Sequence, residues 1–113
     1  MNKKRELIFY KDYFRDFYKS QAKKVQTKII WTFRIIEDIE RIPEIYFKHF
    51  ENADGLYEIR IQLGSDIYRI FCFFDDENIV VVGHGFQKKT QKTLQKEIEK
   101  AQKIRKEYFD EKE

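Results

Sequence analysis

The sequence has few of the residues that build disulfides, metal centres and long loops. Its 113 residues include one cysteine, one proline and four glycines. A single cysteine, Cys72, excludes an internal disulfide and any metal site made from several cysteines. Proline and glycine are the strongest local signals of turns and loops, so their scarcity leaves little room for long irregular segments.

Long hydrophobic runs are also absent. No stretch approaches the roughly 20 apolar residues that a membrane-crossing helix needs. Only the run LIFY at 7–10 follows the basic N-terminus, which is too short for the apolar core of a signal peptide. We therefore expect a cytoplasmic protein with no membrane partner, and the lone cysteine fits that reducing compartment.

What the sequence does contain is typical of a globular protein. Hydrophobic residues make up 42% of it, charged residues 38% and aromatic residues 17%. Such a composition excludes a disordered chain, because enough apolar surface is available to form a core. The length is that of one domain, so we expect residues 1–113 to fold as a single unit.

Hydrophobic spacing predicts helices at both ends of the chain. Apolar residues three and four apart indicate helices over 12–21 and 23–41, the second ended by Pro43, and together these form a helical hairpin. The same spacing predicts a C-terminal helix over 94–109, with fraying over 110–113. Residues 6–10 are a short β-prone run, typical of an edge strand.

Between the helices the hydrophobic period changes to two. Residues 57–63 alternate between apolar and polar side chains, and strands over 67–74 and 79–86 follow after short turns. Connections this short favour antiparallel pairing, because parallel strands need long crossovers. The predicted fold is α+β: an N-terminal helical hairpin and a C-terminal helix packed on a small antiparallel β-sheet.

The small net charge of +3 hides a strong segregation of charge. Residues 1–34 carry ten basic and three acidic side chains, residues 37–58 two and seven, and residues 84–106 eight and two. The balances are therefore +7, −5 and +6. Two basic blocks of this kind indicate a polyanionic partner, although lysine-rich solvated helix faces give the same pattern.

The run KKTQK at 88–92 lies where the last strand leads into the last helix. A helix N-terminus attracts anions and repels cations, so lysines there are unfavourable unless an anion lies close by. We interpret the run as a phosphate-binding segment. The alternative is a solvated linker.

Two arginines lie on the polar sides of the predicted strands. Arg60 alternates away from Ile59 and Ile61, and Arg69 shares its face with Phe71 and Phe73. Guanidinium groups beside exposed rings suit RNA, because phosphates accept paired hydrogen bonds and splayed bases stack on rings. In the alternative, Arg60 pairs with an acidic neighbour such as Glu58 and both phenylalanines belong to the core.

The two histidines, His49 and His84, do not define a metal site without a spaced carboxylate cluster. They are far apart in sequence, so we do not expect them to act as an acid–base pair. His84 is expected near the basic segment. The sequence predicts no metal and no cofactor.

Four short blocks, taken in order, resemble the phage-derived HigB-like branch of the RelE/ParE toxin superfamily. They are GLYEIR at 55–60, YRIF at 68–71, HGFQKKTQKT at 84–93 and KEIEKA at 96–101. The resemblance extends over about residues 55–109. The family usually has proline after the position of Thr93, where this chain has Leu94, a difference that affects the start of the helix.

The resemblance implies helices on one face of an antiparallel sheet and the toxin of a type II toxin–antitoxin pair. It implies cleavage of mRNA in the ribosome's decoding site, with ribosome and mRNA as partners. It further implies an antitoxin with a helix-turn-helix domain, so that DNA is reached only through the antitoxin. Alternatives are a ParE-like inhibitor of DNA gyrase and a non-catalytic module that binds RNA or the ribosome.

Roles for single residues follow as hypotheses. Arginine stays protonated, so Arg60 and Arg69 are expected to stabilise charge on the reacting phosphate. A lysine crowded by cations can act as a base, and Lys89 is the first choice and Lys92 the second. Glu58 is an alternative base or orients Arg60. The residues expected to contact RNA are Lys88, Gln91, Phe71, Phe73 and His84.

Overall fold

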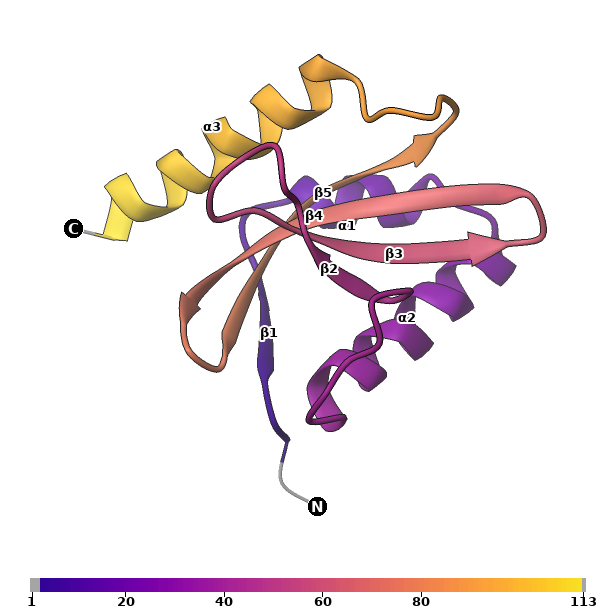
Figure 1. Cartoon of the computed structure of the whole chain (residues 1–113), viewed down its shortest axis with the longest axis horizontal. Helices are drawn as coiled ribbons and strands as arrows, with labels where there is room; N and C mark the ends of the chain where they lie inside the picture. Colours follow the sequence, from indigo (N-terminus) through magenta and orange to yellow (C-terminus); the bar gives the residue numbers. More distant parts are fainter. Residues whose placement is uncertain (1–2, 113) are drawn as a thin grey trace.

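The computed structural model describes residues 3–112. One strand and two helices are followed by four strands and a long final helix (Figure 1). The elements are β1 (Glu6–Phe9), α1 (Tyr13–Lys19), α2 (Lys23–Asp38), β2 (Phe47–His49), β3 (Tyr57–Leu63), β4 (Asp66–Asp76), β5 (Ile79–Lys88) and α3 (Gln95–Lys112). This arrangement confirms the predicted α+β class.

The five strands form one sheet in the order β1-β5-β4-β3-β2. The predicted antiparallel meander is confirmed for β3, β4 and β5. The sheet as a whole is mixed rather than antiparallel, because β1 pairs in parallel with β5 and so occupies one edge. The short strand β2, which the sequence analysis did not predict, forms the other edge by antiparallel pairing with β3.

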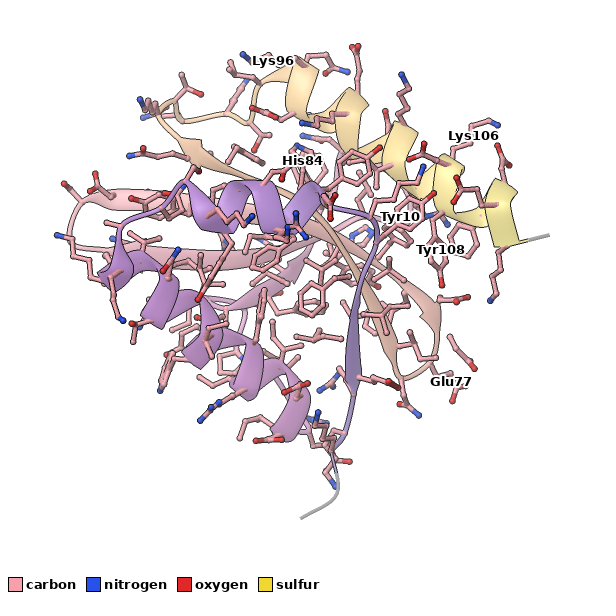
Figure 2. All side chains as sticks on the ribbon, turned by 180° about the vertical axis from the view of Figure 1, so that it is seen from behind. Tyr10, Glu77, His84, Lys96, Lys106 and Tyr108 are labelled. Carbon is pink, nitrogen blue, oxygen red and sulfur yellow. The ribbon has the colours of Figure 1, made fainter. Side chains whose placement is uncertain are left out.

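Helices α1 and α2 cover one face of the sheet and lie in front of it in Figure 2. The period of two in β3 places Ile59 and Ile61 on this face, where they join the helical residues Ile29 and Phe33 in one buried cluster. Cys72 belongs to the same cluster and is buried there as a free thiol. Burial of this alternating face fixes the register of the strands.

Helix α3 covers the opposite face, so the expectation that all helices lie on one face is wrong. Its buried residues Ile98 and Ala101 pack against Phe71, and Ile104 packs against Phe73. Phe71 and Phe73 point to the face of the sheet opposite α1 and α2, so this second face is also apolar. A second apolar face needs a second cover to exclude water, and α3 provides it.

The C-terminal half of α3 is tied to the rest of the fold by polar contacts. The Tyr108 hydroxyl and the Lys112 ammonium both donate to the Asp75 carboxylate, each at 2.6 Å. The Tyr13 hydroxyl donates to Glu107 at 2.8 Å. The helix therefore continues to Lys112, and the fraying predicted over 110–113 is not seen as far as residue 112.

Within residues 3–112 no helix is long and apolar enough to cross a membrane.

Candidate functional site

The candidate site is built on two adjacent strands, β3 and β4. Arg60 of β3 pairs directly with Arg69 of β4 in the antiparallel ladder, and Glu58 lies two residues before Arg60 on the same face. The side chains of Arg69 and Glu58 are 8% and 9% exposed, and Arg69 Nε lies 3.7 Å from Glu58 Oε2. A buried carboxylate thus lies against the guanidinium group of Arg69 and on the same strand face as Arg60.

Alternation along β3 explains why these groups meet. Ile59 and Ile61 are drawn into the α1–α2 core, which turns Glu58 and Arg60 toward the α3 face. The tight turn at Gly64, which has a φ of +59°, then sets the register that brings Arg69 opposite Arg60. The sequence pattern and the turn together create the cationic pair.

The two arginines are only partly neutralised. The Nε atoms of Arg60 and Arg69 are buried without a hydrogen-bond partner. Their terminal nitrogens donate to main-chain carbonyls, Arg60 Nη1 to Glu44 at 3.3 Å and Arg69 Nη1 to Tyr68 at 3.1 Å. Burial, followed by the charge of Arg60, lowers the pKa of Arg69, while Glu58 opposes this shift. Such a cluster favours an anion.

Lys88, the last residue of β5, belongs to the same electrostatic cluster. Burial and the neighbouring charge of Arg69 lower the pKa of Lys88, with Arg60 acting in the same direction and Glu58 against it. A lowered pKa increases the fraction of neutral amine, the form that can accept a proton. Lys88 is therefore the lysine that the fold couples to both arginines.

A cavity of about 490 Å³ opens beside this cluster. Its lining includes Glu58 and Lys88 together with Gln91 and Lys92 from the segment that follows β5. Lys89 instead lines two other hollows that also contain Lys88 but not Glu58. The structure thus brings Lys92 and Gln91 to Glu58 as a shared cavity lining, and leaves Lys89 outside it.

The two phenylalanines expected to contact RNA are buried. Phe71 and Phe73 are 1% and 2% exposed, because α3 covers their face of the sheet. Neither ring can stack on a base in this structure, so that expectation is wrong. The alternative, that both belong to the core, is correct.

His84 is also inside the protein, at 3% exposure. Its Nε2 lies 3.1 Å from Glu97 Oε1 of α3, and its Nδ1 is buried without a partner. Burial lowers the pKa of His84, which favours the neutral ring. The residue joins β5 to α3 beside the site, and the expectation of direct contact with RNA is wrong for this structure.

Side chains able to hold a metal ion do not gather within the part of the chain that the structure describes. In residues 3–112 no group of three or more His, Cys, Asp or Glu side chains is placed to do so. His49 packs edge-on against Tyr57 at 5.1 Å between ring centroids, while His84 contacts Glu97.

Comparison with known families gives one match. The profile of the family described as "Phage derived protein Gp49-like (DUF891)" matches residues 16–106. The chain belongs to the Gp49-like family. This match extends from α1 into α3 and includes every residue of the cluster and its cavity. No curated protein matches the sequence.

Gp49-like proteins are associated with RelE-like toxins of toxin–antitoxin pairs. This association agrees with the resemblance of the four sequence blocks and suggests an antitoxin as a partner of this Gp49-like chain.

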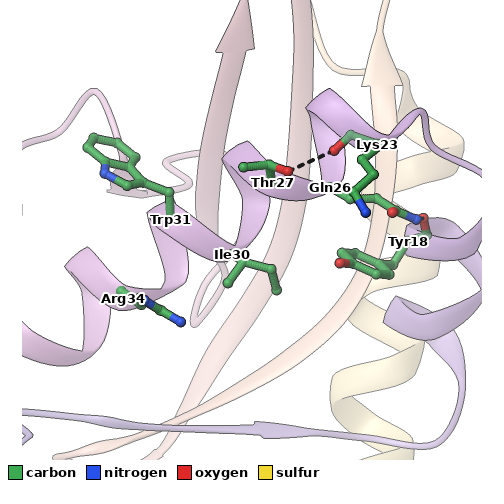
Figure 3. A pocket seen from close by; sticks show the side chains of 7 residues that line it. All are labelled: Tyr18, Lys23, Gln26, Thr27, Ile30, Trp31 and Arg34. Atoms are coloured by element: carbon green, nitrogen blue, oxygen red, sulfur yellow. Dashed lines mark hydrogen bonds between the residues drawn. The ribbon is translucent and has the colours of Figure 1, made fainter.

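This Gp49-like chain has a further hollow, of about 410 Å³, on the outer side of α2 (Figure 3). Trp31 is 45% exposed beside it, and the Lys28 ammonium lies 4.2 Å from the centre of its ring. The hollow is also lined by the cations Lys23 and Arg34. Within the described residues none of the basic side chains of α2 forms an ion pair, so the part of the first basic block that lies on α2 presents unneutralised charge.

Sequence reasoning missed the central place of Lys88 because it ended the last strand at residue 86. Arg69 of β4 pairs with Phe86 of β5, so these two side chains lie on the same face of the sheet. Alternate residues of a strand share a face, and Lys88 therefore lies on the face of Phe86 and Arg69. It also missed Asn52, Gln95 and Gln102, which line the cavity from two other segments. No local pattern indicates that these amides meet.

Proposed function

We propose that this Gp49-like protein is the toxin of a type II toxin–antitoxin pair and cleaves mRNA on the ribosome. Within the toxins we assign the protein to the HigB-like branch, and we expect its inhibitor to be an antitoxin that carries a helix-turn-helix domain. The observation that supports it is the cluster of Arg60, Arg69 and Lys88 around Glu58, beside an open cavity. The anionic group of RNA that such a cationic cluster would bind is the phosphodiester.

The chemistry needs a proton acceptor, charge stabilisation and a proton donor. Lys88, as the neutral amine, removes the proton from the 2′-hydroxyl, and the 2′-oxygen forms a bond to phosphorus. Arg60 and Arg69 stabilise the extra negative charge on the phosphate oxygens. The bond from phosphorus to the 5′-oxygen breaks, Lys92 gives that oxygen a proton, and the products are a 2′,3′-cyclic phosphate and a 5′-hydroxyl.

In this scheme Glu58 orients Arg69 and Arg60 and keeps the cluster folded in the absence of RNA. Lys89, the first choice from the sequence, becomes a secondary contact because it lies outside the cavity that contains Glu58. The reaction as written requires no metal ion. The ribosome is expected to align the 2′-hydroxyl with the phosphate. Alignment of this kind lowers the activation barrier by up to about 7–11 kcal/mol in ideally oriented reactions.

The basic face of α2 supports a polyanionic partner as large as the ribosome. Its unneutralised cations lie on a helix that does not line the proposed reaction site, so they suit contact with ribosomal RNA rather than with the cleaved strand. Counterions released from RNA by such contacts strengthen binding at low salt.

Incubation of the protein with translating ribosomes, followed by primer extension, tests the activity. New 5′ ends are expected within translated codons for the wild type. Arg69→Ala should lower their rate of appearance by about 10²–10³-fold, as loss of a charge-stabilising donor does. Arg15→Ala is the control, because Arg15 is exposed and its ion pair with Asp12 is remote from the cluster.

The other outcomes separate the alternative functions. Ribosome binding without new ends, at excess protein, would leave a non-catalytic binding module. Inhibition of DNA supercoiling by purified gyrase, with mRNA intact, would instead identify a gyrase inhibitor.

A further inference from the structure

The polar lining of the cavity beside the arginine cluster is of two chemical kinds. Glu58, Lys88 and Lys92 are charged. The remaining polar wall is made almost entirely of carboxamides: Asn52, Gln91, Gln95 and Gln102. These amides come from three separate segments, the connection between β2 and β3, the segment after β5, and α3. The fold therefore gathers carboxamides that the sequence disperses.

The four carboxamides take no part in the hydrogen bonds that hold the described residues together. Among the described residues, their side chains make no hydrogen bond to any other group of the protein. Gln95 and Gln102 are seven residues apart on α3, and this spacing places both on the side of the helix that lines the cavity. Their donors and acceptors are therefore free to meet a ligand.

The apolar part of the lining is as well defined. Phe50 and Ile98 are only 8% and 7% exposed and line the same cavity. Phe50 is held edge-on against Phe71, with 5.2 Å between ring centroids. The result is a cavity with an apolar surface at two residues and hydrogen-bonding amides around it. Its volume of about 490 Å³ lies within the usual range for ligand sites, about 300–1,000 Å³.

A phosphate alone does not account for this lining. Phosphate oxygens only accept hydrogen bonds, so they could pair with the NH2 groups of the four amides but would leave the amide carbonyl oxygens without a donor. A nucleobase has an apolar ring with donors and acceptors at its edge, and Asn and Gln side chains recognise such edges with paired hydrogen bonds. The two lysines of the same cavity, Lys88 and Lys92, suit the phosphate attached to that base.

We propose that this cavity is a nucleobase subsite, in which Asn52, Gln95 and Gln102 bind the edge of an unstacked base whose phosphate lies beside Lys88 and Lys92. The inference rests on the proposed function, because it names how RNA would be read beside the reacting phosphate. Reading is by hydrogen bonds at the cavity wall, since Phe71 and Phe73 are buried and cannot supply a stacking surface.

Binding of mononucleotides tests this subsite without any cleavage. The intact protein is titrated with each of the four nucleoside 3′-monophosphates and with inorganic phosphate, and the side-chain amide signals are followed by NMR. At least one nucleotide should bind threefold or more tightly than phosphate and shift the amide signals of Asn52, Gln95 or Gln102. Equal affinity of all four nucleotides and phosphate, or no binding of any of them, would overturn the proposal.

A variant with Asn52→Ala, Gln95→Ala and Gln102→Ala should bind that nucleotide no more tightly than it binds phosphate. Gln87→Ala is the matched control, since Gln87 is an exposed glutamine next to Lys88 that does not line this cavity. Thermal melting establishes that each variant is folded, and single substitutions replace the triple variant if it is not. Retention of the nucleotide preference by the variants contradicts the subsite.

Cleavage separates the subsite from the proposed function. If the wild type cuts mRNA, the triple variant should still cut it but with a changed preference for the base at the cut position. An unchanged preference overturns the subsite and leaves the nuclease. If the wild type cuts no mRNA yet shows the nucleotide preference in NMR, the nuclease proposal fails and the subsite stands.

Discussion

Arg60 and Arg69 lie directly opposite each other in the β3–β4 ladder, with Glu58 as the acidic neighbour of Arg69. Like charges in directly opposed positions of a sheet destabilise it by about 0.2–1 kcal/mol. One carboxylate offsets two guanidinium groups only in part, and neither Nε atom makes a hydrogen bond. The site is therefore organised at some cost to the folded state, and an anion would relieve that cost.

Replacement of one arginine of the pair should reveal this cost. We expect Arg60→Gln to melt at the same temperature as the wild type or slightly higher, because it removes the repulsion. Added phosphate should raise the melting temperature of the wild type more than that of the variant, since binding to the folded state stabilises it. Calorimetry at several phosphate concentrations measures both effects. An equal response of the two proteins would mean that the pair does not bind the anion.

A lysine base gives the cleavage reaction a characteristic dependence on pH. Since the pKa of Lys88 is lowered, the neutral amine should increase as the pH rises toward that pKa, and the rate should increase with it. Lys88→Arg should lose this rise, because arginine is not deprotonated in proteins. Single-turnover cleavage on ribosomes over a pH series measures the effect.

Lys89→Arg provides the comparison for the Lys88 prediction. It should keep the increase of rate with pH, because Lys89 lies outside the cavity that contains Glu58. If the rise were lost in Lys89→Arg and kept in Lys88→Arg, the assignment from the sequence would be restored.

His84 should make the protein less stable in mild acid. Burial lowers its pKa in the folded state below the unfolded value of about 6.5, so the unfolded state binds more protons in the window between the two values. The free energy of unfolding should therefore fall as the pH drops below about 6.5, by at most about 1.4 kcal/mol per pH unit from this group. Urea unfolding between pH 5 and pH 8 measures the slope.

The slope assigned to His84 should be smaller in His84→Phe. His49→Phe should retain it, because His49 lies on the edge strand β2, away from the contact between His84 and Glu97. A slope that is the same in all three proteins would assign the acid sensitivity to other groups.

The basic face of α2 should control binding to the ribosome rather than cleavage itself. A variant with Lys23→Gln, Lys28→Gln and Arg34→Gln should bind ribosomes more weakly and with a shallower dependence on salt. If each cation contacts one phosphate of folded or single-stranded RNA, the slope of log affinity against log salt should fall by about 2. Filter binding across a salt series measures it.

The control for α2 removes three other cations. Lys3→Gln, Lys11→Gln and Lys112→Gln lower the net charge equally, but each of these lysines is paired with a carboxylate in the structure. An equal loss of affinity in both variants would show that overall charge, not the face of α2, attracts the ribosome.

The sequence was informative wherever a short-range pattern carries the information. Alternation in residues 57–63 correctly separated the buried Ile59 and Ile61 from Arg60, because successive side chains of a strand point to opposite faces. It could not reveal the short strand β2, whose three residues are too few for a periodic signal. It also could not place α3, because the side of a sheet that a helix covers depends on contacts distant in the chain.

For the candidate site, the sequence was sufficient to identify the charged residues of β3 and β4. It was not sufficient to show which lysine lies beside them. Glu58, Arg60 and Arg69 were identified because a polar strand face with two arginines is visible in the alternation. Lys88 was separated from Lys89 only by the register of β5 against β4, which decides which of two neighbouring lysines faces the arginines.

By itself, the sequence determined one α+β chain with a meander, segregated positive charge and two arginines on a polar strand face. Local periodicity, turn length and charge order are sufficient for these conclusions, because each depends on residues close together in the chain. The tertiary structure alone decided that Phe71 and Phe73 are covered by α3, that Lys88 joins the arginines, and that Asn52 meets Gln102 at one cavity. Those facts depend on how distant segments pack, and packing is settled only when the whole hydrophobic surface is buried at once.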